Sequence, residues 1–304
     1  MTTFAALTAQ VKQQLMGFTK NQVSITYLDQ PMTATDITFT VDTETVTSIS
    51  RGLVEIDDEM LLVKKYDRTS GVVTVMADLA GRGREGTVAS AHDALSIVTA
   101  DPDFPTVRIQ EAINACIQAT YPDLFRFSSF EFPKNAARYE YILPPDAEGV
   151  YKVTADTIGP SKIWFPVQRW RFNNNASMDP VEGSSTGKSI QVMDDIVPGR
   201  MIRVIYTGPP GTFSLPEEEF VDATGYPERY VDMIMYGTVA RMLPALEASR
   251  LQQSSIESAE RAPLVPTGAA SQASQYFWSL YYRRLEEERK RLHVLNEEYT
   301  NFLS

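Results

Sequence analysis

Apolar positions at the start of the chain recur with helical spacing. Phe4, Leu7, Val11, Leu15 and Phe18 follow one another at intervals of three or four residues. This spacing puts all five side chains on one face of an α-helix. We therefore predict a helix over residues 4–18 that buries this stripe.

The pattern changes to that of β-strands between residues 21 and 100. Ile37, Phe39 and Val41 alternate with polar residues, as in a strand with one buried face. Further short apolar runs predict strands at residues 53–56, 60–63 and 72–75. We predict a small β module over 21–100.

A helix is predicted between the prolines that follow this module. One helical face is shared by Ile109, Ala112, Ile113 and Cys116. A proline disfavours helical geometry in the residue before it, so the helix should end before Pro122. The helix therefore spans about 105–121. A second β-rich module is predicted over 129–215, from strand-like segments at 139–143, 150–153, 163–167 and 201–206.

Two helices are predicted in the last part of the chain. The first begins at Pro227, a residue favoured in the first turn, extends to about 247, and should break or kink at Pro244. Residues 261–275 are rich in Pro, Gly, Ala and Ser and are predicted to form a linker.

The second of these helices spans 276–302. Its apolar stripe consists of Phe277, Tyr281, Leu285, Leu292, Leu295, Tyr299 and Phe302, interrupted by Glu288. An amphipathic helix at a chain end can dock on a partner or pack on its own domain. The pattern leaves both alternatives open.

Composition narrows the classes of function. The chain has 304 residues and a formal net charge of −11, which disfavours free-standing nucleic-acid binding. An excess of acidic residues would also suit a channel surface past which DNA slides without binding. No apolar run is long enough to span a membrane, the N-terminal segment does not resemble a secretion signal, and the single cysteine excludes an internal disulfide.

Two glycine-rich segments resemble phosphate-binding motifs. The segment Gly183–Ser189 has three residues, not four, before its Gly-Lys pair, and a strand is predicted after it, so a loop is favoured over a nucleotide site. The segment Gly81–Gly86 matches GxGxxG, but a β-hairpin precedes it rather than the start of a βαβ unit. We predict no cofactor and no catalytic site.

The remaining reactive side chains also favour structural roles. His92 and His293 lack Cys or His neighbours at metal-binding spacing. His92 is predicted to form structural hydrogen bonds, and His293 to lie on a surface. Cys116 lies on the apolar face of its helix, where a packed thiol is favoured over a nucleophile.

Three stretches resemble structural proteins of tailed bacteriophages. The segment GRGREGTVASAH at 81–92 is similar to one that closes small β modules in those proteins, although Ala94-Leu95 stands where that family often has a glycine. Residues 107–125 (VRIQEAINACIQATYPDLF) resemble a helix of phage neck proteins, and residues 276–288 resemble the terminal helix of head-to-tail adaptors. The resemblance covers roughly a third of the chain.

This resemblance implies an α+β fold, a helical bundle with a long C-terminal helix and two inserted β-rich modules. The bundle would comprise residues 1–20, 101–128 and 216–304, and the modules residues 21–100 and 129–215. The turn of the first module would depend on Gly81, Gly83, Gly86 and His92.

The implied function is that of a head-to-tail adaptor in the virion neck, made in the host cytoplasm. A closed ring of twelve copies would join the portal protein to tail proteins, and genomic DNA would pass through it without specific binding. The predicted portal or subunit interface consists of Phe277, Trp278, Tyr281, Tyr282, Arg283, Arg284, Leu285 and Leu292. The alternatives are another tail component (tail tube, baseplate or fibre attachment) and a tail-associated cell-wall hydrolase.

Overall fold

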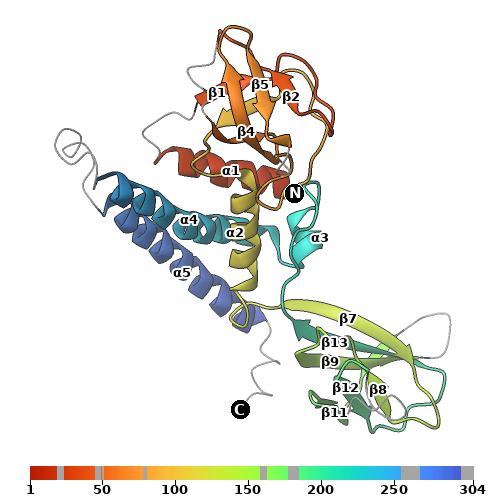
Figure 1. Cartoon of the computed structure of the whole chain (residues 1–304). Coiled ribbons are helices and arrows are strands. Elements are labelled where there is room, and N and C mark those ends of the chain that lie inside the picture. The colour runs from red at the N-terminus through yellow and green to blue at the C-terminus, as the bar shows by residue number, and fades with distance from the viewer. Residues whose placement is uncertain are drawn as a thin grey trace. The chain divides into compact units, whose positions relative to one another are not determined.

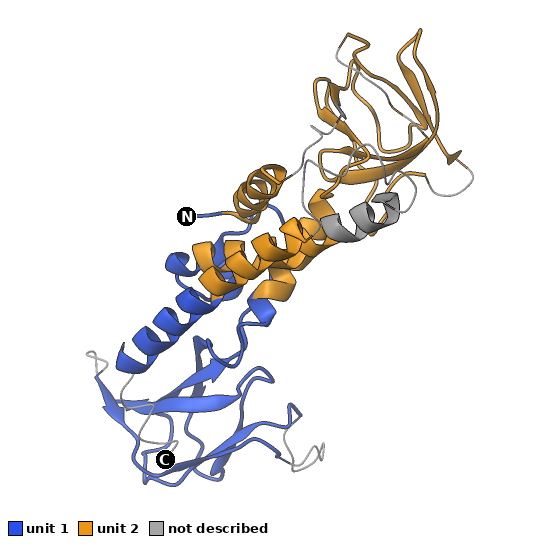
Figure 2. Cartoon of the chain, turned by 90° about the vertical axis from the view of Figure 1, so that its left-hand side faces the viewer, with its two compact units in different colours: residues 1–2, 117–230, 282–304 blue, residues 3–116, 231–281 orange. Residues whose placement is uncertain are grey.

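The computed structural model describes residues 1–18, 24–44, 49, 51–77, 81–157, 163–176, 185–254 and 268–295 (Figure 1). The chain divides into two compact units (Figure 2). Unit 1 contains residues 1–2, 117–230 and 282–304, and unit 2 contains residues 3–116 and 231–281. Two of the four boundaries fall inside helices, α2 (Thr106–Gln118) and α5 (Ala269–Leu295).

Unit 2 contains a six-stranded antiparallel sheet that curls into a partial barrel. Its strands are β1 (Ser24–Tyr27), β2 (Thr38–Thr40), β3 (Gly52–Ile56), β4 (Glu59–Asp67), β5 (Val72–Val75) and β6 (Ile97–Ala100), in the spatial order β1-β6-β3-β4-β5-β2. The two edges meet where Leu28 bridges to Val41. Backbone hydrogen bonds of 2.9 Å (Asp29 N to Thr40 O) and 3.0 Å (Asp42 N to Tyr27 O) join them.

The interior of the partial barrel is filled by apolar side chains at alternate positions along the strands. Phe39 and Val41 are buried, as the alternation predicted, but Ile37 is 47% exposed because strand β2 begins after it. The rest of this core comprises Leu28, Met32, Ile49, Val54, Ile56, Leu61, Val63, Val73, Val75 and Val98. The predicted strands at 53–56, 60–63 and 72–75 are confirmed within β3, β4 and β5.

Helix α1 (Phe4–Met16) confirms the first predicted helix. Thr3 caps it by accepting a 3.2 Å hydrogen bond from the backbone N–H of Ala6, which satisfies a donor that has no partner within the helix. The buried side chains are those of the predicted stripe up to Leu15, together with Thr8. Phe18 lies beyond the helix, with its ring edge against Phe277 at a centroid distance of 5.9 Å.

Helix α4 (Val231–Ser254) runs through Pro244. Of the two predicted effects of this residue, the break is wrong and the kink stays a prediction. Proline removes one backbone donor, and here the loss does not end the helix. The helix predicted at 105–121 is confirmed as α2, whose Ile109, Ile113 and Cys116 are buried.

Helices α2, α4 and α5 approach closely at Gly237 of α4. A Cβ atom on Gly237 would lie 2.4 Å from Sγ of Cys116 and 2.8 Å from Cδ2 of Tyr281. Carbon atoms do not approach other heavy atoms so closely without displacement. The absence of a side chain at Gly237 therefore sets how closely these helices pack.

Helix α5 begins at Ala269, seven residues before its predicted start. The predicted linker 261–275 is therefore wrong for residues 269–275, and its residues 261–267 lie outside the described ranges. Ala270 and Ser274 are buried, and Ser274 Oγ donates a 2.7 Å hydrogen bond to Ala240 O of α4. The small residues that suggested a linker instead form a helical packing face. Residues 296–302 of the predicted helix also lie outside the described part.

Unit 1 is a β-sandwich. One sheet has the order β10-β9-β13-β7 and the other β11-β12-β8, and neighbouring strands in both are antiparallel. The strands are β7 (Arg126–Pro133), β8 (Glu140–Ile142), β9 (Gly149–Asp156), β10 (Trp164–Pro166), β11 (Trp170–Asn173), β12 (Ser189–Val192) and β13 (Met201–Gly208). Val153 and Val204 of one sheet share a buried core with Ile190 of the other. A short helix, α3 (Phe220–Thr224), and a 3₁₀ turn, η2 (Glu228–Tyr230), follow.

The predicted fold class is wrong. The described residues contain thirteen strands in three antiparallel sheets and five α-helices, so the chain is mostly β rather than a helical bundle with a long C-terminal helix and inserted β modules. The physical reason is that each β-rich segment buries an apolar core of its own. The sheets are therefore the main architecture and not insertions.

Candidate functional site

A buried polar cluster in unit 2 is centred on Glu59, the first residue of β4. Its side chain is 1% exposed. Arg82 donates to both carboxylate oxygens, from Nε at 2.6 Å and from a terminal nitrogen at 2.8 Å. The backbone N–H groups of Gly83 and Ser90 each donate at 3.0 Å. This is a bidentate arginine–carboxylate pair, the strongest type of hydrogen-bonded ion pair.

Arg82 also connects the glycine-rich segment to other loops. Its terminal nitrogens donate to the carbonyl oxygens of Thr33 (2.9 Å), Asp36 (2.8 Å) and Ser90 (2.6 Å). A guanidinium has five N–H groups in a fixed planar arrangement. Arg82 therefore fixes three segments of the barrel relative to Glu59.

His92 closes the cluster from the other side of Glu59. The residue is 4% exposed, with Nε2 2.9 Å from Glu59 Oε2 and Nδ1 2.8 Å from Asp57 Oδ2. Its backbone pairs with Met32 through two hydrogen bonds of 2.8 Å. His92 thus links the β3–β4 turn, the glycine-rich segment and the loop after β1.

The electrostatics of the cluster favour an ionised Glu59. Burial raises the pKa of Glu59, but the hydrogen bonds from Arg82, Ser90, His92 and Gly83 outweigh it and lower the pKa to about 2. Hydrogen bonds donated to a carboxylate stabilise its charged form. The ion pair with Arg82 is therefore intact at neutral pH.

The glycines of this segment have steric reasons to be glycine. Gly83 and Gly86 adopt φ values of +61° and +88°, which residues with a Cβ atom rarely adopt. Gly81 has no room for a side chain, because a Cβ would lie 2.4 Å from the carbonyl oxygen of Met76.

The same geometry explains the dinucleotide-like pattern. The arginine and backbone N–H groups that could bind a phosphate at Gly81–Gly86 already bind the Glu59 carboxylate. A side chain of the chain itself fills the anion site. In the other segment, Ser189 begins strand β12 rather than a helix, and Lys188 donates to Asn174 and, at 3.3 Å, to Glu148.

Helix α5 presents part of the predicted interface to solvent and buries the rest. Phe277 and Tyr281 of the predicted interface are buried, at 5% and 4% exposed, so they do not lie on the solvent-facing side of the helix. Phe277 packs against Phe18 and Tyr236 instead. The other buried members of the predicted set are Leu285 and Leu292, and Trp278 and Arg284 are half-buried.

The exposed members of that set lie in unit 1. Tyr282 is 59% exposed, and Arg283 is also exposed. Lys290, about two turns further along the same helix, has a side chain that is 74% exposed. Together these three residues form an outward aromatic and basic face of α5.

Sequence reasoning missed the role of Glu288 on this helix. The side chain is fully buried, and it accepts hydrogen bonds from Arg229 (2.7 Å) and Arg291 (2.9 Å). The hydrogen bond from Arg229 to Glu288 raises the pKa of that guanidinium. A charged residue at an apolar stripe position was the signal for a buried ion pair.

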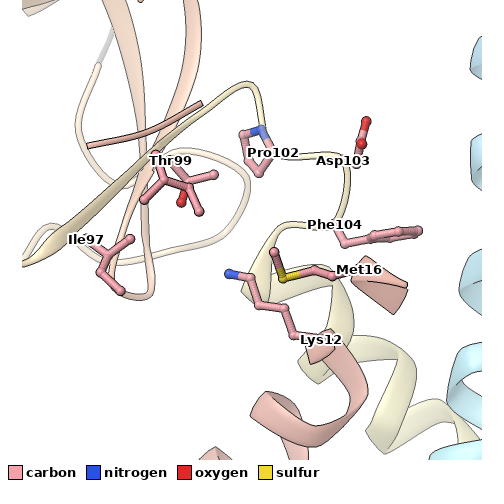
Figure 3. Close-up of a pocket in the computed structure, with 8 residues that line it drawn as sticks. Lys12, Met16, Ile97, Thr99, Pro102, Asp103 and Phe104 are labelled. Carbon is pink, nitrogen blue, oxygen red and sulfur yellow. The ribbon is translucent and has the colours of Figure 1, made fainter. Parts of the chain in front are cut away.

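A groove of about 280 Å³ opens in unit 2 between α1 and the barrel. Figure 3 shows Lys12 and Met16 of α1 reaching toward Ile97 and Thr99 of β6, with the connection to α2 beside them. The lining residues are Lys12, Met16, Ile25, Ile97, Thr99, Pro102, Asp103 and Phe104. Lys12 Nζ donates to Glu55 (2.9 Å) and to Thr106 Oγ1 (3.0 Å).

The described parts of the chain contain no group of three or more His, Cys, Asp and Glu residues able to hold a metal ion. Nor does any described helix have the length and apolar character needed to cross a membrane.

Comparison with known proteins gives no assignment. No protein-family model matches the chain, and a search of curated protein sequences found no match.

Proposed function

We propose that this chain is a structural subunit of a tailed-bacteriophage head-to-tail adaptor. It would form a ring that joins the portal to the tail and extends the DNA channel. The first support is the sequence resemblance at residues 81–92, 107–125 and 276–288. The first segment contributes Arg82 and His92 to the polar cluster around Glu59. The second forms helix α2 with the turn after it, and the third forms part of α5.

The second support is the way the chain uses its polar side chains. Both carboxylate oxygens of Glu59 and both of Glu288 accept hydrogen bonds from within the chain. Catalytic groups instead need a substrate within reach. This pattern is typical of a protein whose buried charges stabilise its fold.

The observation that carries the proposal is the outward face of α5. Tyr282, Arg283 and Lys290 project from a helix whose opposite face is buried. Tyrosine and arginine are enriched among residues that dominate binding energies at protein interfaces. In the proposal this face contacts the portal protein.

The acidic balance of the chain is compatible with a DNA channel. The formal net charge is −11, and like charges repel the phosphate backbone at short range. A ring with an acidic lumen would let DNA pass without holding it.

The test is electron cryo-microscopy of the purified protein mixed with the portal protein from the same genome. We expect a ring stacked coaxially on the portal with α5 at the contact. Deleting residues 270–304 is a poor test, because it removes the buried side chains of Phe277 and Tyr281. Substituting exposed residues is cleaner.

The discriminating variants are Tyr282→Ala and Arg283→Glu, with Arg68→Glu as the matched control. Arg68 is exposed in the β4–β5 turn, and its reversal changes the net charge by the same amount. The α5 variants should lose portal binding while Arg68→Glu keeps it. If the α5 variants bind like the wild type, the contact is assigned to the wrong face; if the wild type ignores the portal, a distal tail component becomes the better interpretation.

A further inference from the structure

The outer face of the β1–β6 strand pair is apolar, although its side chains do not belong to the barrel core. In the register of this pair, Ile25 lies opposite Thr99 and Tyr27 opposite Ile97. Ile25, Tyr27 and Ile97 are 39%, 42% and 51% exposed. The other face of these strands, with Leu28 and Val98, fills the interior.

This arrangement departs from the usual pattern of a half-buried antiparallel sheet. Such a sheet has a polar face toward solvent. Here the solvent face instead continues into the groove beside Met16, which is 42% exposed, with the buried ring of Phe104 at its wall. Grouped exposed apolar side chains of this kind mark interaction surfaces.

The size of the groove favours a side chain as its occupant. Pockets that enclose whole small-molecule ligands typically have volumes of roughly 300–1,000 Å³. The groove measures about 280 Å³ and lies open along the strand pair. It can take one or two large side chains from a partner whose backbone passes over the strand pair.

The charges around the groove are acidic. Lys12, the cation in the groove lining, is bonded to the Glu55 carboxylate, so its charge is compensated. Asp103 lines the groove, and Asp101 just before it is exposed. The β module at 21–100 has twelve Asp and Glu residues against six Lys and Arg.

The raised pKa of the nearby Asp58 carboxyl group is consistent with this negative potential. Burial raises the pKa of Asp58, and so do the nearby carboxylates of Glu55 and Asp57, against the opposing effect of Lys12. Complementary charge steers partners to a surface and excludes partners of like charge.

We propose that this groove is a docking site for a basic segment of a partner protein, which inserts an apolar side chain between α1 and the β1–β6 strand pair. The inference goes beyond the adaptor proposal, because it concerns none of the α5 residues. The two proposals can therefore fail separately.

The probe is a short fluorescent peptide with a central Phe-Leu pair flanked by lysines. Two control peptides replace the lysines with glutamates or the Phe-Leu pair with serines. Fluorescence anisotropy on the full chain should show saturable binding of the first peptide alone, weakening with added salt. Equal binding of the glutamate peptide, or no binding of the lysine peptide, would overturn the proposal.

The matched variants are Ile97→Ser in the groove and Val88→Ser outside it. Both residues are exposed, Val88 at 81%, so both variants should fold. Ile97→Ser should weaken peptide binding on the order of tenfold, as the loss of an anchoring contact does, and Val88→Ser should leave it unchanged. Undiminished binding by Ile97→Ser refutes the site. A dimer of the chain that Ile97→Ser abolishes would reassign the groove to a second copy and refute the proposed occupant.

Discussion

Replacing Glu59 with glutamine should selectively destabilise the barrel of unit 2. The substitution keeps the size of the side chain but removes its charge and turns one oxygen into a donor. That NH₂ group would face the donors of Arg82 and either Gly83 or Ser90. Arg82, whose side chain is 9% exposed, would become a buried cation without its carboxylate.

The magnitude follows from two independent routes. Removing one partner of a buried ion pair typically costs about 3–5 kcal/mol. The Glu59 pKa of about 2, against an ordinary 4.5, corresponds to about 3 kcal/mol at roughly 1.4 kcal/mol per pKa unit. We expect Glu59→Gln to lower the free energy of unfolding of the barrel by about 3 kcal/mol at neutral pH.

The same pKa predicts a pH dependence. The folded-state pKa of Glu59 is depressed, so its contribution is fully present above pH 4.5 and is lost as the pH falls from about 4.5 to about 2. The wild-type barrel should lose stability over this range. Glu59→Gln lacks the titrating group, and the difference between the two proteins should shrink toward low pH.

Hydrogen exchange resolved by peptide is the suitable assay, because two units need not unfold together. Amides of strands β3 to β5 should lose protection in Glu59→Gln, whereas those of β9 and β13 in unit 1 serve as the internal reference. Asp57→Asn is the matched control, since the Asp57 side chain is 51% exposed and its loss should cost less than about 1 kcal/mol. A loss below 1 kcal/mol in Glu59→Gln, or an equal loss in both units, would refute the reasoning.

Three further predictions concern the helices. Gly237→Ala should lower the melting temperature and cost about 1–3 kcal/mol, because its Cβ would lie 2.4 Å from Cys116 Sγ; an unchanged melting curve would contradict the close packing with Tyr281. Glu288→Gln should cost about 1.5–3 kcal/mol in urea unfolding monitored on unit 1 amides, since it weakens charge-assisted hydrogen bonds to a buried carboxylate from Arg229, whose side chain is 39% exposed; a neutral effect would show that the pair is not needed. Burial raises the pKa of Cys116 to about 11, so iodoacetamide at pH 8 should modify the urea-unfolded chain and not the folded one.

The sequence predicted local elements better than their relation to one another. The stripe from Phe4 to Leu15 identified α1, because helical periodicity is written in neighbouring residues. The alternation around Phe39 identified a strand, although its first apolar residue is exposed. Ala and Ser before residue 276 suggested a linker, since the same small residues serve flexible segments and close helix packing. Their role is decided by the neighbouring helix, which periodicity does not reveal.

The candidate sites were less accessible from sequence for a physical reason. Glu59 and Arg82 are separated by 23 positions and meet through the fold of the barrel, and no local pattern encodes that meeting. His92 was predicted to form hydrogen bonds, but no sequence pattern identified Asp57 and Glu59 as its partners. The fold class failed similarly. The apolar stripes of the helices were easy to recognise in the sequence. That the short strands form the main architecture is evident only from the structure, where each β-rich segment buries its own core.

The meeting of the two barrel edges has a consequence for self-association. Exposed strand edges are templates on which other chains can add strands, and they promote aggregation. Strands β1 and β2 are short and are joined through Leu28 and Val41, so the barrel offers few backbone groups to an incoming strand. Any contact that the barrel makes must then depend on side chains, which can discriminate between partners in a way that backbone pairing cannot.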